Sequence, residues 1–204
     1  MRNNEFFSSE RGEEYFKHHS TGQQPKITLV SCCDSRVQPG IIDPDPINKI
    51  FTVETIGNQM TSAQGSVDYG VLHLHTPVLL IMGHTDCGAV KAFMKGYDRE
   101  NDAIKRELDN MKPALKPVAA DADFNAELIS NIKKNVDHQV NIAVDRYTNY
   151  VRDGKLTVIG SVYDFQNAFG KGWGRLLLRS INGKSDLKKE DLIACGVDLI
   201  DVMV

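Results

Sequence analysis

Four short runs of apolar and β-branched residues, separated by longer segments with helical spacing, constrain the fold of this chain most strongly. The runs cover residues 27–32, 49–54, 77–82 and 155–163. Runs of this length and composition are typical of strands, and the third is apolar throughout, which indicates burial on both faces. Strands that alternate with helices predict an α/β domain with a mainly parallel central β-sheet flanked by α-helices.

The intervening segments predict the helices. Residues 62–75 carry apolar side chains at helical spacing, a helix is expected to begin near Asp86, and residues 99–151 are charged and mostly helical. No linker and no internal repeat divides the sequence, so we expect residues 1–204 to form a single domain.

The first 24 residues form a separate polar segment. Its aromatic residues occur at loosely helical spacing: Phe6, Phe7, Tyr15 and Phe16. We therefore expect residues 1–24 to be an N-terminal helical arm that packs on a partner subunit.

Composition indicates a globular protein of the cytoplasm. Hydrophobic residues make up 41% of the 204 residues, and the net charge is only −3 with both signs interspersed. That balance argues against binding to nucleic acid or to a membrane surface. The longest apolar run is too short to cross a bilayer, and the first residues lack the apolar core of a secretory signal. We expect a cytoplasmic protein.

Two cysteines and a histidine stand at the ends of two predicted strands. Cys32 closes the first run, and His84 and Cys87 follow the third. Ligands of parallel sheets bind beyond the carboxyl ends of the strands. Two thiolates and an imidazole suit Zn²⁺, and three protein ligands leave one of its four positions open, as in catalytic sites. Of the other cysteines, Cys195 has no Cys or His neighbour and is expected in the core.

Asp34 and Arg36 lie two residues apart beside the first of these ligands. A guanidinium can hold a carboxylate through two parallel hydrogen bonds, which keeps the carboxylate ionised and oriented. Next to a metal, Asp34 could then accept a proton from a zinc-bound water, whose pKa zinc lowers to about 7. An isolated pair of this kind is more often a structural salt bridge, and the neighbouring thiols favour the catalytic interpretation.

These segments together resemble the two signature motifs of the β-class carbonic anhydrases. They read Cys32-x-Asp34-Ser35-Arg36 and His84-x-x-Cys87-Gly88. The resemblance extends from about Gln23 to Tyr163. It implies a zinc lyase, carbonate dehydratase, that reversibly hydrates carbon dioxide to bicarbonate and a proton through a zinc-bound hydroxide.

The same resemblance assigns further roles. The residues that match the family's substrate pocket are Gln23, Phe51, Ile56, Tyr69 and Gly88. The family forms homodimers, often joined into tetramers, with active sites at the dimer interface and the glutamine supplied across it. In the family the aspartate that matches Asp34 either pairs with the arginine or takes the fourth zinc position in a closed, inactive form.

Two positions depart from the family pattern. Glu54 stands near the place of an arginine that helps form a non-catalytic bicarbonate site, so we expect no allosteric regulation by bicarbonate there. Cys33 follows Cys32 where a small residue is usual. Neighbours on a strand point to opposite faces, so we expect Cys33 to be a buried, small apolar residue.

Two other functions remain open at this point. A hydrolase of carbonyl sulfide or carbon disulfide could use the same scaffold, because these linear molecules resemble carbon dioxide. A non-catalytic zinc-binding protein could use the fold for assembly, although it would need neither Asp34 nor Arg36.

Overall fold

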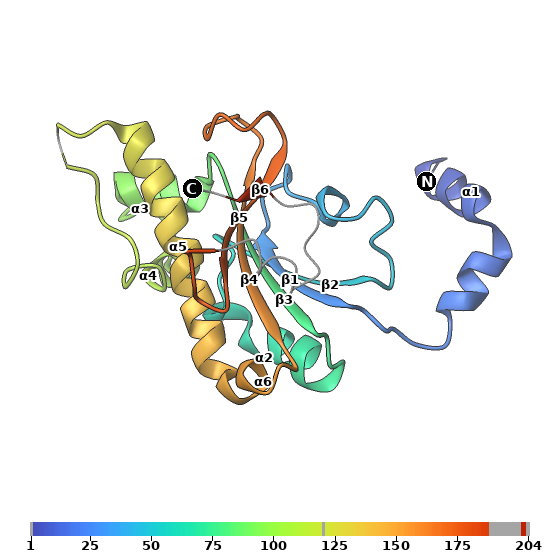
Figure 1. Cartoon of the computed structure of the whole chain (residues 1–204). Helices are drawn as coiled ribbons and strands as arrows, with labels where there is room; N and C mark the ends of the chain where they lie inside the picture. The colour runs from blue at the N-terminus through green and yellow to red at the C-terminus, as the bar shows by residue number, and fades with distance from the viewer. Residues whose placement is uncertain (1, 120, 188–200, 203–204) are drawn as a thin grey trace.

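The computed structural model describes residues 2–119, 121–187 and 201–202, and a six-stranded sheet forms its centre (Figure 1). The strands follow the order β2-β1-β3-β4-β5-β6. They are β1 (Ile27–Cys32), β2 (Ile50–Thr55), β3 (Val78–His84), β4 (Thr157–Asp164), β5 (Arg175–Ile181) and β6 (Asp201–Val202). The first four strands are the four predicted runs, and they pair in parallel. The predicted α/β class and mainly parallel sheet are confirmed.

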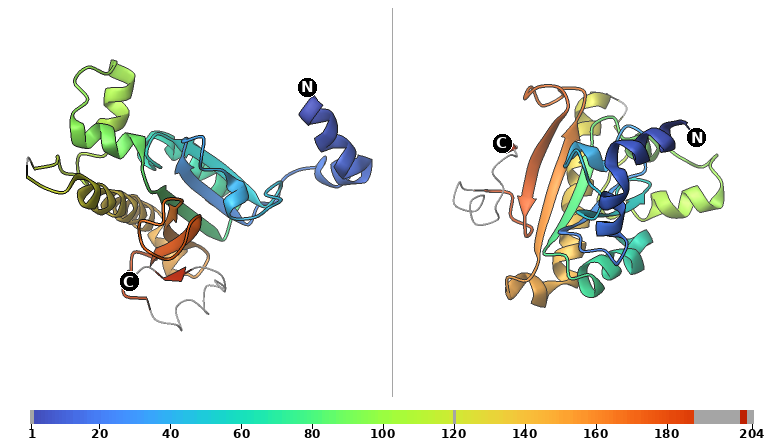
Figure 2. Two further views of the ribbon diagram at one scale, coloured as in Figure 1. Left: turned by 90° about the horizontal axis from the view of Figure 1, so that it is seen from above. Right: turned by 90° about the vertical axis from the view of Figure 1, so that its right-hand side faces the viewer.

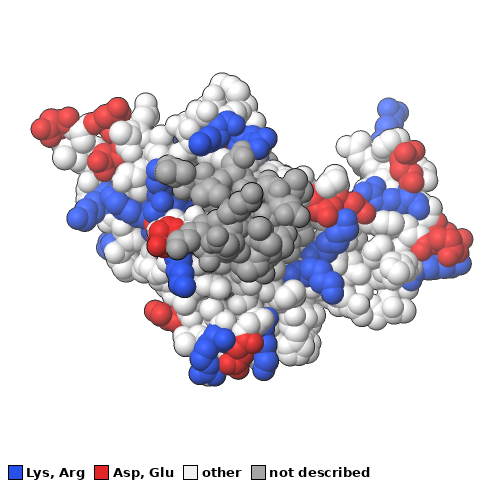
Figure 3. All heavy atoms as spheres, viewed as in Figure 1, with Lys and Arg blue, Asp and Glu red and all other residues white. Residues whose placement is uncertain are grey.

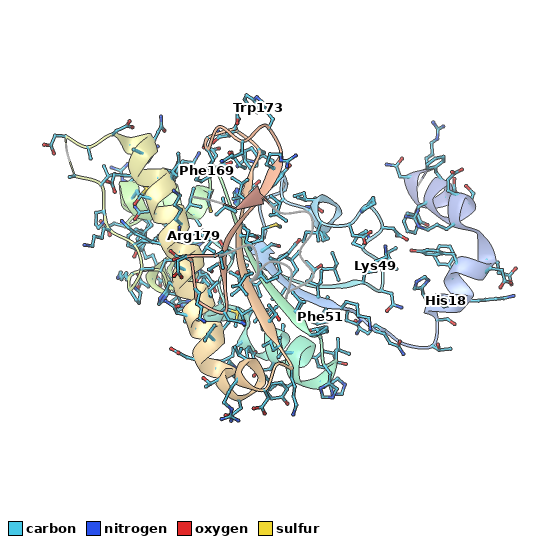
Figure 4. All side chains as sticks on the ribbon, in the orientation of Figure 1. His18, Lys49, Phe51, Phe169, Trp173 and Arg179 are labelled. Atoms are coloured by element: carbon cyan, nitrogen blue, oxygen red, sulfur yellow. The ribbon has the colours of Figure 1, made fainter. Side chains whose placement is uncertain are left out.

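β5 is a strand that the sequence analysis did not identify. It pairs antiparallel with β4, so that Tyr163 faces Leu176, and the connection between them carries the exposed Trp173 (Figure 4). The carboxylate of buried Asp164 accepts hydrogen bonds from three backbone amides of this connection, those of Gln166, Ala168 and Phe169. These bonds satisfy the buried charge and fix the start of the loop.

One face of the sheet is covered by helices. They are α3 (Gly88–Lys95), α4 (Asp102–Asp109), α5 (Phe124–Arg146) and α6 (Thr148–Arg152). α5 packs across β3 and β4, where its buried Ile132, Val136 and Val140 recur every four residues and form the main core with strand residues such as Ile81 and Val158. The side chain of Asp123 caps the first turn of α5 by accepting hydrogen bonds from two backbone amides.

The opposite face carries a smaller core. It contains Leu29, Leu80, Met82 and Leu178, with Val37 packed against them. A loop after β1 supplies further half-buried apolar residues to this face. Both faces of β3 are therefore buried, as its unbroken apolar run predicted.

The predicted helix over residues 62–75 is built from three short turns of different pitch. They are a 3₁₀ turn (Thr61–Ala63), α2 (Gln64–Asp68) and a π-helical turn (Tyr69–His73). Within this segment Val67 and Val71 are buried, whereas Tyr69 and Leu72 are exposed. Only glycine fits at position 70, because a Cβ there would collide with Thr28 Oγ1 on β1.

α1 (Arg2–His19) stands away from the sheet in both Figure 1 and Figure 2. No residue of α1 is buried, Phe6 is 66% exposed, and a kink at Gly12 bends the helix. Arg11 and Tyr15 attach it to the rest of the chain through the carboxylate of Asp45. The predicted helical arm is present, with Phe6 and Phe16 exposed and Phe7 and Tyr15 half-buried.

The surface of the described residues carries mixed charge. On the face drawn in Figure 3, Lys and Arg lie interspersed with Asp and Glu. Among the described residues, no helix has the length and apolarity that a membrane span requires.

Candidate metal centre

The three predicted ligands meet at one edge of the sheet. Cys32 is the last residue of β1, His84 is the last residue of β3, and Cys87 precedes the first turn of α3 as its N-cap. Their ligand atoms lie within 4.8 Å of one another, and all three side chains are buried. The parallel register of β1 and β3 produces this meeting, because it aligns the carboxyl ends of both strands.

The imidazole of His84 is arranged as a metal ligand. Its Nδ1 lies 2.8 Å from the backbone oxygen of Thr85, so Nδ1 carries the proton and Nε2 is left with a free lone pair. Nε2 is buried and has no hydrogen-bond partner among the described residues. A histidine ligand of zinc is normally oriented by such a bond from its other nitrogen.

The two thiols complete a donor set that fits a divalent cation. A hydrogen bond between the side chains of Cys32 and Cys87 lowers the pKa of Cys32 and raises the pKa of Cys87. The pair therefore shares one proton, because two adjacent buried thiolates repel each other. Zn²⁺ would remove this conflict by neutralising both thiolates, and the tetrahedral Cys₂His set leaves it one open position.

Asp34 and Arg36 form the bidentate pair that the sequence predicted. Arg36 Nε donates to Asp34 Oδ1 at 2.8 Å, and Nη2 donates to Oδ2 at 2.6 Å. These bonds hold the pKa of Asp34 well below its usual value, so the carboxylate is ionised. Asp34 Oδ2 lies 3.9 Å from His84 Nε2, which places the carboxylate beside the ligand group.

Three further residues, not identified from the sequence, fix the guanidinium of Arg36. Asp86 accepts from Nη1 at 3.1 Å and is itself paired with Lys91 at 2.7 Å. Phe165 lies under the guanidinium, 4.5 Å from ring centroid to Cζ, and also stacks on the ring of His84. Asp86 lies between the ligands His84 and Cys87 in the sequence, and this position could have identified it as a residue of the site.

The expectation for Cys33 was wrong. Its side chain is exposed. β1 ends at Cys32, and the backbone then turns, with Val37 N donating to Asp34 O at 2.8 Å. Cys33 consequently lies beyond the part of the strand that the helices and loops cover. Cys195 lies outside the described residues.

The five predicted pocket residues separate into two groups. Ile56 follows the end of β2, and Gly88 follows Cys87 directly, so both border the ligand group. Phe51 and Tyr69 contact each other, with ring centroids 5.8 Å apart. Phe51, which is labelled in Figure 4, pairs with Thr28, four residues before Cys32. That offset is about 13 Å along the strand.

Gln23 belongs to the group that is remote from the ligands. It is exposed and precedes the opposite end of β1. Glu54 is also exposed and pairs with Ser31 across the two strands.

Comparison with known proteins agrees with this site. The family model described as carbonic anhydrase matches residues 27–171. The chain is 39% identical over 170 residues to carbonic anhydrase 2 of Mycobacterium tuberculosis, and the match covers 78% of this chain and 77% of that protein. It is 27% identical over 180 residues to the chloroplastic beta carbonic anhydrase 5 of Arabidopsis thaliana, of which it spans only 58%.

Solved structures agree in fold. A tetrameric β-carbonic anhydrase of Sordaria macrospora superposes with a TM-score of 0.73 at 20% identity, covering 87% of this chain and 92% of that one. A Coccomyxa β-carbonic anhydrase in complex with acetazolamide gives a TM-score of 0.69 at 22% identity, covering 80% and 79%. At these identities the likeness establishes the fold.

Proposed function

Because this chain belongs to the β-class carbonic anhydrase family, we propose that it catalyses the zinc-dependent, reversible hydration of carbon dioxide to bicarbonate and a proton. One observation supports this most strongly. A buried Cys₂His group that could hold a metal ion lies beside an ionised carboxylate that a guanidinium orients. A purely structural zinc site would require no such carboxylate.

In this proposal Cys32, His84 and Cys87 hold the zinc ion. Bound zinc supplies a hydroxide nucleophile at neutral pH by lowering the pKa of its water to about 7. The protein holds the imidazole in one tautomer through Thr85 O and shields the ligands from solvent by burying them. Burial also strengthens every charge interaction at the centre.

Asp34 receives the proton in this proposal, and Arg36 positions it. The carboxylate is charged and accepts three hydrogen bonds from Arg36, counting that from its backbone amide at 3.0 Å. Since the guanidinium occupies one side of the carboxylate, the remaining lone pairs can face the ligand group. Asp86, Lys91 and Phe165 keep the guanidinium in this orientation.

We also propose that the active enzyme is a homodimer or a tetramer. Gln23, Phe51 and Tyr69 lie toward the other end of the sheet from the ligands of their own chain, so they could line the pocket of a second copy. The exposed aromatic residues of α1 offer a surface for the same contact. The tetrameric relative from Sordaria macrospora is consistent with this assembly.

Stopped-flow hydration of carbon dioxide by the zinc-loaded protein tests the proposal. We expect hydration to depend on bound zinc and to disappear when a chelator removes the metal. A parallel assay with carbonyl sulfide separates the hydrolase alternative, since a hydrolase would cleave carbonyl sulfide faster than it hydrates carbon dioxide. A zinc-loaded protein that is inactive toward both substrates would contradict an enzymatic function.

A further inference from the structure

A strained loop of residues 55–60 lies against the metal-binding edge. It begins at Thr55, which pairs with Cys32 in the strand register and accepts a hydrogen bond from Cys33 N at 3.0 Å. Gly57 and Asn58 both have left-handed backbone conformations, with φ of 76° and 49°. Non-glycine residues in that region cost energy and persist only where the surroundings impose the conformation.

Gly57 lies beside two of the ligands. It follows by two residues Thr55, the strand partner of Cys32, and a Cβ on Gly57 would lie 3.4 Å from the Cβ of Ala89, in the first turn of α3 after Cys87. A side chain at this position would also lie 2.9 Å from Met111 Sδ, so the packing here favours glycine. Groups packed around a metal ligand orient it and so affect how tightly the metal is held. The conformation of this loop therefore bears on the metal ligand.

Two buried amides of α5 impose that conformation. Asn135 Nδ2 donates to Gly57 O at 2.9 Å and to Asn58 Oδ1 at 3.2 Å. Gln139, one turn later, accepts from Met60 N at 2.8 Å and donates to Asn135 Oδ1 at 3.3 Å. Both side chains are about 1% exposed. Buried amides of this kind are costly unless bonded, so they specify one geometry of the loop.

We propose that Asn135 and Gln139 are positioning residues of the metal centre, which hold the 55–60 loop against the end of β1 at Cys32 and the start of α3 at Cys87 and thereby raise the affinity for the metal. This inference rests on the proposed function, in which Cys32 ligates zinc. It assigns a role to a helix that contributes no ligand, and it locates that role in two side chains on one face of α5.

The same helix provides a matched control. Asn131 is one turn before Asn135 and is equally buried, and it bonds the backbone of Lys116 in both directions, at 3.1 Å and 3.5 Å. Its partner lies outside the 55–60 loop. Substitution of Asn131 by alanine thus removes the same chemical group from the same helix without releasing Gly57.

The test compares Asn135→Ala, Gln139→Ala and Asn131→Ala in the full chain. Zinc affinity is measured by competition with a chromophoric chelator, and the thiolate charge-transfer absorption of the cobalt(II)-loaded protein reports on the sulfur ligands. Melting temperatures are measured alongside. Loss of a partner of a metal ligand costs about 10-fold to 100-fold in metal affinity. Asn135 acts through the loop and not on a ligand directly, so we expect a loss at the lower end of that range for Asn135→Ala. We expect a smaller loss for Gln139→Ala, which leaves Asn135 in place.

We expect Asn131→Ala to lower the melting temperature comparably while zinc affinity and the cobalt absorption stay unchanged. Equal loss of zinc affinity in Asn131→Ala and Asn135→Ala would overturn the inference, since the effect would then come from stability alone. Undiminished affinity in both Asn135→Ala and Gln139→Ala would also overturn it. Failure of the unmodified protein to bind zinc would refute the proposed function itself, and the two failures are therefore distinguishable.

Discussion

Arg36 and Asp34 form a two-bond ion pair whose carboxylate lies 3.9 Å from Nε2 of His84, which has no hydrogen-bond partner among the described residues. A carboxylate this close to an electron-pair donor of the metal group can either assist a reaction there or become a ligand itself. The geometry of Arg36 decides between these outcomes, because its Nε and Nη2 occupy both carboxylate oxygens. Asp86 and Phe165 in turn hold the guanidinium.

Removal of this guanidinium should stop hydration without removing zinc. In Arg36→Ala the carboxylate of Asp34 is free to take the fourth metal position, so we expect kcat/KM to fall by at least about a hundredfold. Zinc content should remain at one per chain because the three protein ligands are untouched. Arg152→Ala, which removes an exposed pair with Asp153, is the control and should retain full activity. An undiminished rate in Arg36→Ala would contradict the role given to this pair.

The pH dependence of hydration should come from the metal-bound water and not from Asp34. The hydrogen bonds from Arg36 lower the pKa of Asp34 below its unfolded value of about 3.9. The pair therefore stabilises the fold above that pH, and the stabilisation is lost only as the pH falls through the lower, folded value. We expect kcat/KM to rise with pH around pH 7, the value typical of zinc-bound water.

Asp34→Asn tests whether Asp34 accepts the proton. An amide cannot take up a proton, so we expect a much lower rate at every pH, with the rising limb still near pH 7. Stopped-flow profiles of both proteins provide the measurement. A flat profile for the unmodified enzyme from mildly acidic to alkaline pH would be incompatible with this mechanism.

Substitution of Cys32 should remove bound zinc, whereas substitution of its neighbour Cys33 should not. Cys32 is buried within the ligand group, whereas Cys33 is exposed. We expect Cys32→Ser to lose most of its bound zinc and its activity, and Cys33→Ser to keep both. Metal analysis after dialysis measures the difference, and full zinc content in Cys32→Ser would show that the ligand set is wrong.

Deletion of residues 1–20 should weaken the assembly and the activity together. The deleted segment carries the exposed aromatic side chains of α1 and few attachments to its own chain. We expect sedimentation to reveal a shift toward monomer and hydration to fall in parallel. A fully active monomer would exclude a site that two copies share.

Bicarbonate should inhibit hydration only as a competing product. Glu54 is exposed on β2 and would repel an anion at the position that the family resemblance assigns to a non-catalytic bicarbonate site. We expect inhibition curves without cooperativity. Substitution of Glu54 by glutamine should change them little, and cooperative inhibition of the unmodified enzyme would show that this position is misaligned.

The sequence by itself determined the four parallel strands and the ligand group. Strand runs are readable because burial on both faces requires unbroken apolar residues, as in β3. The ligands were identifiable because Cys32, His84 and Cys87 stand at the carboxyl ends of parallel strands, which must meet at one edge. Asp34 and Arg36 are so close in sequence that their bidentate pairing is a local property.

Only the tertiary structure decided the surroundings of that group. Phe165 stacks on His84, and Asn135 and Gln139 hold the neighbouring 55–60 loop, from segments far away along the chain. Such contacts depend on how α5 and the β4–β5 connection pack. Cys33 was misjudged because alternation along a strand holds only while the strand continues, and β1 ends one residue earlier. The exposure of a side chain beyond a strand end depends on its neighbours in space, which local sequence does not specify.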